Sequence, residues 1–429
     1  MIPAIEKASL EEIKKFQEAK LKETLVYLSE NSPYYKALFA KENIDISSIK
    51  TLEDLQQLPV TTKTNLQENN DDFFCVPMHK IVDYATTSGT LGNPVTFGLT
   101  DGDLDRLAYN EAISFVCSGI QQGDVVQLMT TMDRRFMAGL AYFLGLRKLG
   151  VGVIRVGAGI PELQWDSILK YKPKYLIGVP SFLLKMIEYA ENNNIDYNAS
   201  SVKGVICIGE ALRNQDFSPS VLAKKITDKW DIQLFSTYAS TEMSTAFNEC
   251  DRFQGGHHHP ELIITEILDD NNQPVAAGES GELTITTLGV EALPLLRFKT
   301  GDIVRLHSEP CLCGRTTVRV GPVVGRKQHM IKYKGTTLYP PAMHDLLTFF
   351  EGVQSHLIEI STNDLGTDEI LIKIASNEPT EELLDHIKDH FRAKLRVTPK
   401  VEFIAQDILN KIIFAPMSRK PVTFIDKRI

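Results

Sequence analysis

The feature that most constrains the fold is an alternation of short apolar runs with helical stretches between residues 100 and 240. Apolar runs of strand length occupy residues 125–130, 151–156, 175–179 and 204–208, and residues 181–192 form one of the helical stretches. Strands that are apolar along their whole length are buried on both faces, and intervening helices allow such strands to run parallel. The alternation therefore predicts a parallel sheet that is flanked by helices.

The segments on either side of this region have different patterns. Residues 9–31 begin with a capping box, Ser9 to Glu12, and place apolar side chains on one helical face. This face is expected to pack on the core or against a second copy of the chain in a homodimer. After Glu261, β-like segments at residues 262–268, 281–287 and 302–306 are separated by Gly, Pro and Asn turns, which predicts a second sheet or a small barrel.

Past Gly325 the pattern predicts a small α+β domain. Its expected elements are strands at residues 330–333, 356–361, 370–375 and 401–404 and a helix at residues 380–395. We therefore predict an α/β fold in two domains. A large N-terminal domain, residues 1–326, would combine the parallel α/β sheet with a β-rich subdomain, and a small α+β C-terminal domain would comprise residues 327–429.

Composition and charge narrow the class of partner. The formal net charge is −9, acidic and basic residues are interspersed, and there is no long run of Lys or Arg, so neither nucleic acid nor a membrane is an expected partner. The longest apolar stretch, residues 137–146, is too short to span a bilayer, and the N-terminus lacks the pattern of a secretory signal. We expect a cytoplasmic protein with small-molecule substrates.

One loop between β-like segments is rich in hydroxyl groups and glycine. It consists of Thr86, Thr87, Ser88, Gly89, Thr90, Leu91, Gly92, Asn93 and Pro94. Backbone N–H groups and short hydroxyls can surround a polyphosphate without steric obstruction. No Gly-Lys-Ser/Thr follows, which excludes a Walker loop. Taken alone, the composition fits a flexible hairpin loop equally well.

The loop resembles the phosphate-binding signature of the adenylate-forming enzymes, which include acyl-CoA synthetases, firefly luciferase and nonribosomal peptide adenylation domains. Further segments match that superfamily in the expected order. They are the adenine-contacting loop Tyr238-Ala239-Ser240-Thr241-Glu242, the ribose-binding Asp302, the hinge Gly325-Arg326 with Lys334-Gly335, and the terminal Lys420. The resemblance implies that Glu242 holds Mg²⁺, that Lys420 acts in adenylation, and that the small C-terminal domain is mobile.

Within this superfamily the chain resembles the phenylacetate–CoA ligases from end to end. The resemblance rests on Ser32-Pro33-Tyr34-Tyr35, Thr61-Thr62-Lys63, Glu291-Ala292-Leu293-Pro294-Leu295 and Ile425-Asp426-Lys427-Arg428. It implies an acid–thiol ligase that uses ATP, Mg²⁺ and coenzyme A, forms an acyl adenylate from an aryl or related carboxylic acid, and then forms a CoA thioester with release of AMP and pyrophosphate.

Several substrate contacts follow from the same resemblance. Phe136, Phe235 and Ser236 would line the acyl pocket, and Glu210, in a Gly-Glu-Ala-Leu segment, would lie near the adenine and acyl pockets. For Glu210 a position in the first turn of a helix that follows a strand is nearly as good an interpretation.

A predicted zinc site combines three cysteines with one histidine. Cys250, His257, Cys311 and Cys313 offer three thiolates and one imidazole, which is the ligand set of a closed, structural Zn²⁺ site. Some relatives of phenylacetate–CoA ligase have a similar pattern. His258 and His259 follow His257 directly, and because adjacent side chains diverge in an extended segment, only one of the three is expected to bind.

The chain departs from the family pattern at three places. Asn93 stands where relatives usually have a lysine, Gln328 stands where they have an acidic hinge residue, and residues 131–136 carry the pair Arg134 and Arg135. An arginine that points inward would favour a more polar acid, whereas a solvated pair would leave the pocket unchanged. Two alternative functions therefore stay open, namely acyl transfer to an acceptor other than CoA, and a catalytically weakened nucleotide-binding protein.

Overall fold

The computed structural model describes residues 2–87, 95–333, 336–363, 368–414 and 421–428. Contacts divide the chain into two compact units. The larger comprises Met1–Pro219, Ala223–Thr300 and Val304–Pro322, and the smaller comprises Val323–Ile429 together with Ser220–Leu222 and Gly301–Ile303. Every helix among the described residues is too short or too polar to cross a membrane.

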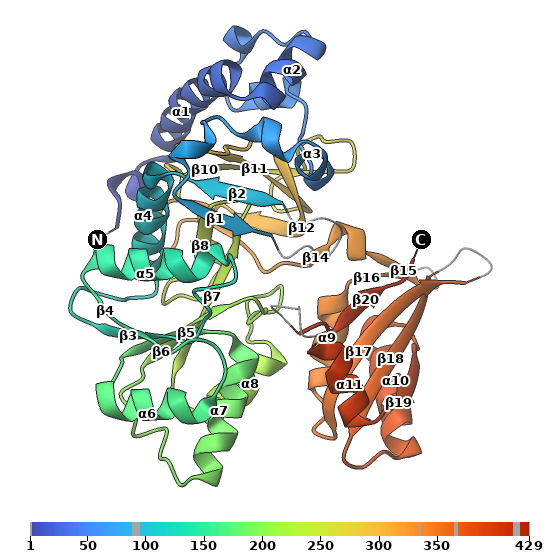
Figure 1. Cartoon of the computed structure of the whole chain (residues 1–429). Helices are drawn as coiled ribbons and strands as arrows, with labels where there is room; N and C mark the ends of the chain where they lie inside the picture. The colour runs from blue at the N-terminus through green and yellow to red at the C-terminus, as the bar shows by residue number, and fades with distance from the viewer. Residues whose placement is uncertain (1, 88–94, 334–335, 364–367, 415–420, 429) are drawn as a thin grey trace. The chain divides into compact units, whose positions relative to one another are not determined.

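The larger unit contains a long mixed sheet and a two-stranded hairpin (Figure 1). The hairpin pairs β1 (Asp83–Thr86) with β2 (Thr96–Leu99). The sheet has the strand order β10-β11-β12-β13-β9-β8-β7-β6-β5-β3-β4. Its strands are β3 (Val125–Leu128), β4 (Gly152–Arg155), β5 (Tyr175–Gly178), β6 (Gly204–Ile208), β7 (Gln233–Ser240), β8 (Thr245–Asn248), β9 (Gly256–His257), β10 (Ile263–Leu268), β11 (Ser280–Thr287), β12 (Phe298–His307) and β13 (Arg319–Val320).

Helices cover both faces of the parallel part of this sheet (Figure 1). The helices of the larger unit are α1 (Leu10–Asn31), α2 (Pro33–Lys41), α3 (Lys63–Glu68), α4 (Asp101–Cys117), α5 (Met137–Leu149), α6 (Pro161–Tyr171), α7 (Pro180–Asn192) and α8 (Val221–Thr227). Apolar residues of α4 and α5 share a core cluster with Val126, Leu128 and Ile206 of the sheet. On the opposite face the buried Gln127 donates to Gln164 of α6. The predicted parallel sheet flanked by helices is confirmed.

The prediction of a separate second sheet is wrong. β10 pairs antiparallel with β11, and β12 pairs antiparallel with β13, as their turn-rich sequence indicates. However, β13 also pairs with β9, and β9 pairs with β8. The antiparallel strands therefore continue the parallel sheet, and no sequence pattern reports which strand edges meet.

The N-terminal helix begins as predicted, because Ser9 accepts from the Glu12 amide and the Glu12 carboxylate accepts from the Ser9 amide. Its inner face is part of the core. Ile13, Leu21, Leu25 and Leu28 are buried, whereas Leu10 is exposed.

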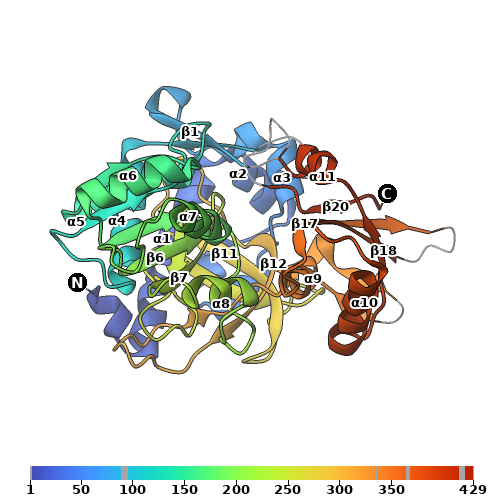
Figure 2. The same ribbon diagram turned by 90° about the horizontal axis from the view of Figure 1, so that it is seen from below.

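The smaller unit has a four-stranded mixed sheet with the order β19-β18-β17-β20. The strands of that sheet are β17 (Val353–Thr362), β18 (Asp368–Ser376), β19 (Lys400–Phe403) and β20 (Phe424–Asp426). The unit also contains β14 (Gly325–Arg326), which pairs with β12, and the hairpin of β15 (Ile331–Tyr333) and β16 (Thr336–Leu338). Its helices are α9 (Pro340–Thr348), α10 (Glu381–Leu395) and α11 (Gln406–Ile413). Figure 2 shows α9 and α10 on one side of this sheet and α11 on the other, which agrees with the two apolar clusters of this unit.

Candidate active site

The parallel strands of the larger unit gather several predicted site residues at one edge of the sheet. β3 pairs in parallel with β5, β5 with β6, and β6 with β7, so the carboxyl ends of all four strands lie on the same side. The residues that follow these ends are the usual ligand contacts of open α/β sheets. Phe136 lies in the segment after β3, Glu210 lies after β6, and Tyr238–Glu242 lie at the end of β7.

Glu242 lies in a tight turn between β7 and β8. The Met243 amide donates to Ser240 Oγ over 3.3 Å, and the Ser244 amide donates to the Thr241 carbonyl over 3.3 Å. Ser244 has a φ of 46°, in the left-handed region that costs energy for a residue with a side chain. Strain of this kind persists where neighbouring groups hold the backbone in place.

The buried Arg106 of α4 is such a neighbour. Its guanidinium donates to the carbonyls of Ser244 and Leu262, each over 2.6 Å, to the carbonyl of Leu288 over 2.7 Å, and to Thr245 Oγ1 over 3.3 Å. Burial lowers the pKa of Arg106 to about 10, which still leaves it charged at neutral pH. Arg106 therefore fixes the turn that carries Glu242, and sequence reasoning missed it because it lies within a helix and outside every motif.

Lys63 is a second residue to which sequence reasoning gave no role. Its Nζ lies 3.6 Å from Glu242 Oε1, and both side chains are partly exposed. Lys63 is the first residue of α3. Two residues earlier, Thr61 forms a parallel bridge with Phe298, and the Thr61 amide donates to the Arg297 carbonyl. The sequence signal was the Thr61-Thr62-Lys63 match to the phenylacetate–CoA ligases.

The hairpin β1–β2 positions the two ends of the predicted phosphate loop. The Thr86 amide donates to the Arg135 carbonyl over 3.1 Å, which ties the hairpin to the segment after β3. The Thr87 amide donates to the Val95 carbonyl, and the Val95 amide donates to Thr87 Oγ1. Ser88, Gly89, Thr90 and Gly92 lie outside the described residues.

The remaining predicted contacts in the larger unit differ in their surroundings. Glu210 accepts from the amide and hydroxyl of Ser181 in the first turn of α7, and it does not begin a helix of its own. The prediction that Glu210 lies in the first turn of a helix is therefore wrong, because an irregular segment follows β6. Phe235 is buried in the sheet core, and the Ser236 amide donates to Glu249. Arg134 and Arg135 are exposed, as a solvated pair would be.

In the smaller unit, Asp302 and Arg326 are neighbours. They are paired residues of β12 and β14, and Arg326 Nε donates to Asp302 Oδ1 over 3.3 Å. The predicted hinge residues Lys334 and Gly335 and the predicted catalytic Lys420 lie outside the described residues.

The four predicted zinc ligands converge in the larger unit. Their ligand atoms all lie within 4.8 Å of one another. The Sγ atoms of Cys250 and Cys311 are 3.6 Å apart, and Cys313 Sγ is 3.4 Å from His257 Nε2. The edges of a tetrahedral Zn²⁺ site are about 3.8 Å between two sulfurs and about 3.6 Å between sulfur and nitrogen. The residues present therefore fit this ion.

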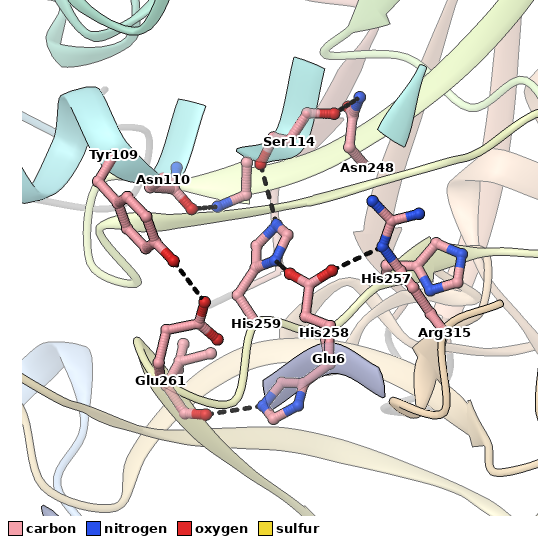
Figure 3. Close-up of polar contacts among 12 residues, drawn as sticks. Glu6, Tyr109, Asn110, Ser114, Asn248, His257, His258, His259, Glu261 and Arg315 are labelled. Atoms are coloured by element: carbon pink, nitrogen blue, oxygen red, sulfur yellow. Dashed lines mark hydrogen bonds and ion pairs between the residues drawn. The ribbon is translucent and has the colours of Figure 1, made fainter. Parts of the chain in front are cut away.

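The three consecutive histidines have three different neighbours (Figure 3). His257 faces the cysteines, His258 Nε2 lies 2.7 Å from the Ile263 carbonyl oxygen, and His259 bonds to Glu6 and Ser114. Only His257 belongs to the cluster of potential metal ligands found among the described residues.

Comparisons with known proteins identify the family. The model of the family described as AMP-binding enzyme matches residues 5–291. Phenylacetate-coenzyme A ligase from Thermus thermophilus is 29% identical over 382 residues, which are 88% of this chain and 84% of that protein. The Escherichia coli enzyme of the same name is 29% identical over 385 residues, which are 87% of this chain and 85% of that protein.

Among solved structures, one of 2-hydroxyisobutyryl-CoA ligase with 2-HIB-AMP is described as the postadenylation state. It matches this chain with a TM-score of 0.86 at 24% identity, and the match covers 100% of this chain and 94% of that ligase chain. The same ligase with 2-HIB-AMP and CoA, described as in the thioesterification state, has a TM-score of 0.71. The predicted fold class and the predicted resemblance are confirmed. The chain therefore belongs to the AMP-binding enzyme family.

Proposed function

We propose that this enzyme is an acyl-CoA ligase similar to phenylacetate–CoA ligase, which activates an aryl or related carboxylic acid with ATP and transfers the acyl group to coenzyme A. The observation that carries the proposal is the arrangement at the carboxyl edge of the parallel strands. There Arg106 holds the turn that carries Glu242, and the Glu242 carboxylate pairs with Lys63. The hairpin that leads into the hydroxyl-rich loop is bonded through the Thr86 amide to the segment after β3.

In the first half-reaction the carboxylate attacks the α-phosphorus of ATP, so cations and donors are needed where negative charge accumulates. Glu242 would hold Mg²⁺, which would neutralise charge on the phosphates. The backbone and hydroxyl groups of Thr86, Thr87, Ser88, Gly89, Thr90 and Gly92 would donate to the phosphate oxygens. Lys63 lies 3.6 Å from Glu242, so when that carboxylate holds Mg²⁺ the lysine would be close enough to contact the phosphate oxygens as well.

The nucleoside and the acid would occupy neighbouring positions. Tyr238, Ala239, Ser240 and Thr241 would contact the adenine, and Asp302 would accept hydrogen bonds from the ribose hydroxyls. Phe136, Phe235 and Ser236 would line the acyl pocket. Phe235, buried in the sheet core, would form the rigid base of that pocket rather than an adjustable wall.

The second half-reaction would need the C-terminal domain, residues 327–429, to turn about the hinge at Arg326. Lys420 would act in adenylation, and Lys334 and Gly335 would line the thiol channel after the turn. Solved structures of 2-hydroxyisobutyryl-CoA ligase, described for both a postadenylation and a thioesterification state of that protein, support this order of events.

We further propose a structural Zn²⁺ ion bound by Cys250, His257, Cys311 and Cys313. Four protein ligands leave no open position, so the ion would stabilise two loops and take no part in the chemistry. Untagged protein is expected to contain one zinc per chain by metal analysis, and an absence of zinc would refute the site.

An acid-dependent ATP–pyrophosphate exchange screen, with and without CoA, tests the activity. Exchange with an aryl acid and thioester formation with CoA are expected. If added hydroxylamine captures the acyl adenylate as a hydroxamate while CoA gives no thioester, a different acyl acceptor is favoured. ATP binding without exchange would favour a catalytically weakened protein.

The role of Lys420 is tested by separating the half-reactions. Lys420→Ala is expected to lower adenylate formation far more than thioester formation from preformed acyl adenylate. Lys411→Ala, an exposed lysine of α11, is the matched control. Equal loss of both half-reactions in Lys420→Ala would contradict the assignment.

A further inference from the structure

The N-terminal segment carries a carboxylate into the interior, next to the cysteine–histidine cluster. Glu6, in the 3₁₀ helix η1 (Ala4–Lys7), is 0% exposed. One of its oxygens lies 2.5 Å from His259 Nδ1, and the other accepts from Arg315 Nε over 2.6 Å (Figure 3). Burial alone raises the pKa of Glu6, but His259 and Arg315 together hold it below its ordinary value, so the carboxylate is charged at neutral pH.

Arg315 connects this carboxylate to the cluster. The arginine is 2% exposed, and its Nη1 lies 3.5 Å from Cys313 Sγ. Its carbonyl accepts from the Cys311 amide over 3.0 Å, so the arginine also shapes the turn that carries two of the ligands. Three thiolates around a divalent ion leave a net negative charge, which a buried guanidinium offsets.

The main chain of the same segment is bonded to the residue after Arg315. The Thr316 amide donates to the Glu6 carbonyl over 2.9 Å, and Thr316 Oγ1 donates to the Ala8 carbonyl over 2.5 Å. Side-chain and main-chain contacts therefore hold residues 6–8 against the loop of Cys311 and Cys313.

The series Ser114, His259 and Glu6 has the order of a hydrolytic triad but not its accessibility. Ser114 Oγ lies 3.0 Å from His259 Nε2, and the exposed fractions of Ser114 and His259 are 1% and 0%. A nucleophile must reach a substrate, so this series serves to orient Glu6.

We propose that residues 4–8 form the outer shell of the metal site and that Glu6 is a positioning residue that holds Arg315 on Cys313. Metal and the N-terminal segment then stabilise each other, and by linkage each is bound more weakly when the other is lost. The inference rests on the proposed zinc site and is independent of the ligase activity.

Zinc release to a chelator tests the side-chain link. Glu6→Gln keeps the volume but offers one acceptor oxygen to two donors. Removal of an outer-shell partner typically weakens metal binding by about 10–100-fold, so we expect release at least about tenfold faster than in the wild type. Glu266→Gln is the matched control, because Glu266 forms a bidentate pair with the buried Arg297. Equal release from wild type and Glu6→Gln, or equal acceleration in both variants, would overturn the proposal.

Hydrogen exchange of the wild-type chain provides a test that does not depend on how a variant folds. Removal of zinc is expected to speed exchange at the Thr316 and Ala8 amides and to leave the Thr61 and Lys299 amides, which bond across another part of the unit, unchanged. No change at Thr316 and Ala8, or no zinc uptake by the wild type, would overturn the inference. The exchange and thioester assays would still decide the ligase activity separately.

Discussion

The buried Glu111 of α4 should make the larger unit less stable as the pH rises. Its side chain is 5% exposed, and Asn110 Nδ2 donates to its Oε1 over 3.0 Å. The neighbouring α5 packs so closely that a Cβ at Gly145 would lie 2.3 Å from Glu111 Cβ. Burial raises the pKa of Glu111 from 4.5 to about 8, and the hydrogen bond from Asn110 opposes only part of that shift.

The sign and size of the effect follow from proton linkage. Below pH 4.5 the group is protonated in both folded and unfolded chains, and its stability contribution is fully present. Between pH 4.5 and about 8 only the folded chain keeps the proton, so stability falls by about 1.4 kcal/mol per pH unit. Across the whole window the loss is about 5 kcal/mol.

The test replaces the acid with its neutral isostere. Glu111→Gln should match the wild type within about 1 kcal/mol at pH 5, and the variant should gain about 3–4 kcal/mol relative to the wild type by pH 8. Urea unfolding followed by tryptophan fluorescence reports this unit, because Trp165 and Trp230 are both buried in it.

Glu188→Gln, at an exposed position of α7, is the control and should show no such pH dependence. A stability difference between Glu111→Gln and wild type that does not change with pH would refute the reasoning, as would a variant less stable than the wild type at pH 8.

Three further predictions concern the site and its support. Glu242→Gln should lower pyrophosphate exchange by about 10²–10³ through loss of charge stabilisation. Its melting temperature should change little, because a partly exposed ion pair such as that with Lys63 contributes about 0–1 kcal/mol. Arg106→Met removes the guanidinium donor from three buried carbonyls, of which that of Leu262 still accepts from the Leu288 amide, and should cost about 3–5 kcal/mol in urea unfolding. Gly256→Ala places a Cβ 2.5 Å from the Phe247 carbonyl oxygen, and thermal unfolding should show a loss of about 1–3 kcal/mol.

Local elements could be read from the sequence because short-range physics sets them. The capping box at Ser9 and Glu12 spans three residues, and it forms as the spacing predicts. Strand β6 occupies the predicted residues 204–208, and all five are buried, as an apolar run of strand length indicates. The ordered motifs likewise indicate the family without reference to any tertiary contact.

The sequence also predicts the four candidate cysteine and histidine ligands, but it does not predict the groups around them. Glu6 is 253 residues from His259 and 309 residues from Arg315, and nothing in its local pattern distinguishes it from a surface acid. The same holds for Arg106, whose acceptors lie 138 to 182 residues away.

The sequence by itself thus determined the local elements and the family and predicted the residues of the candidate site, since each depends on residue types at short or ordered spacing. Only the tertiary structure decided that the antiparallel strands extend the parallel sheet, that Lys63 lies beside Glu242, and that the N-terminal segment bonds to Arg315 and Thr316, next to the candidate metal ligands. The physical reason is that burial and pairing across long chain separations depend on which surfaces meet, and residue spacing does not encode that directly.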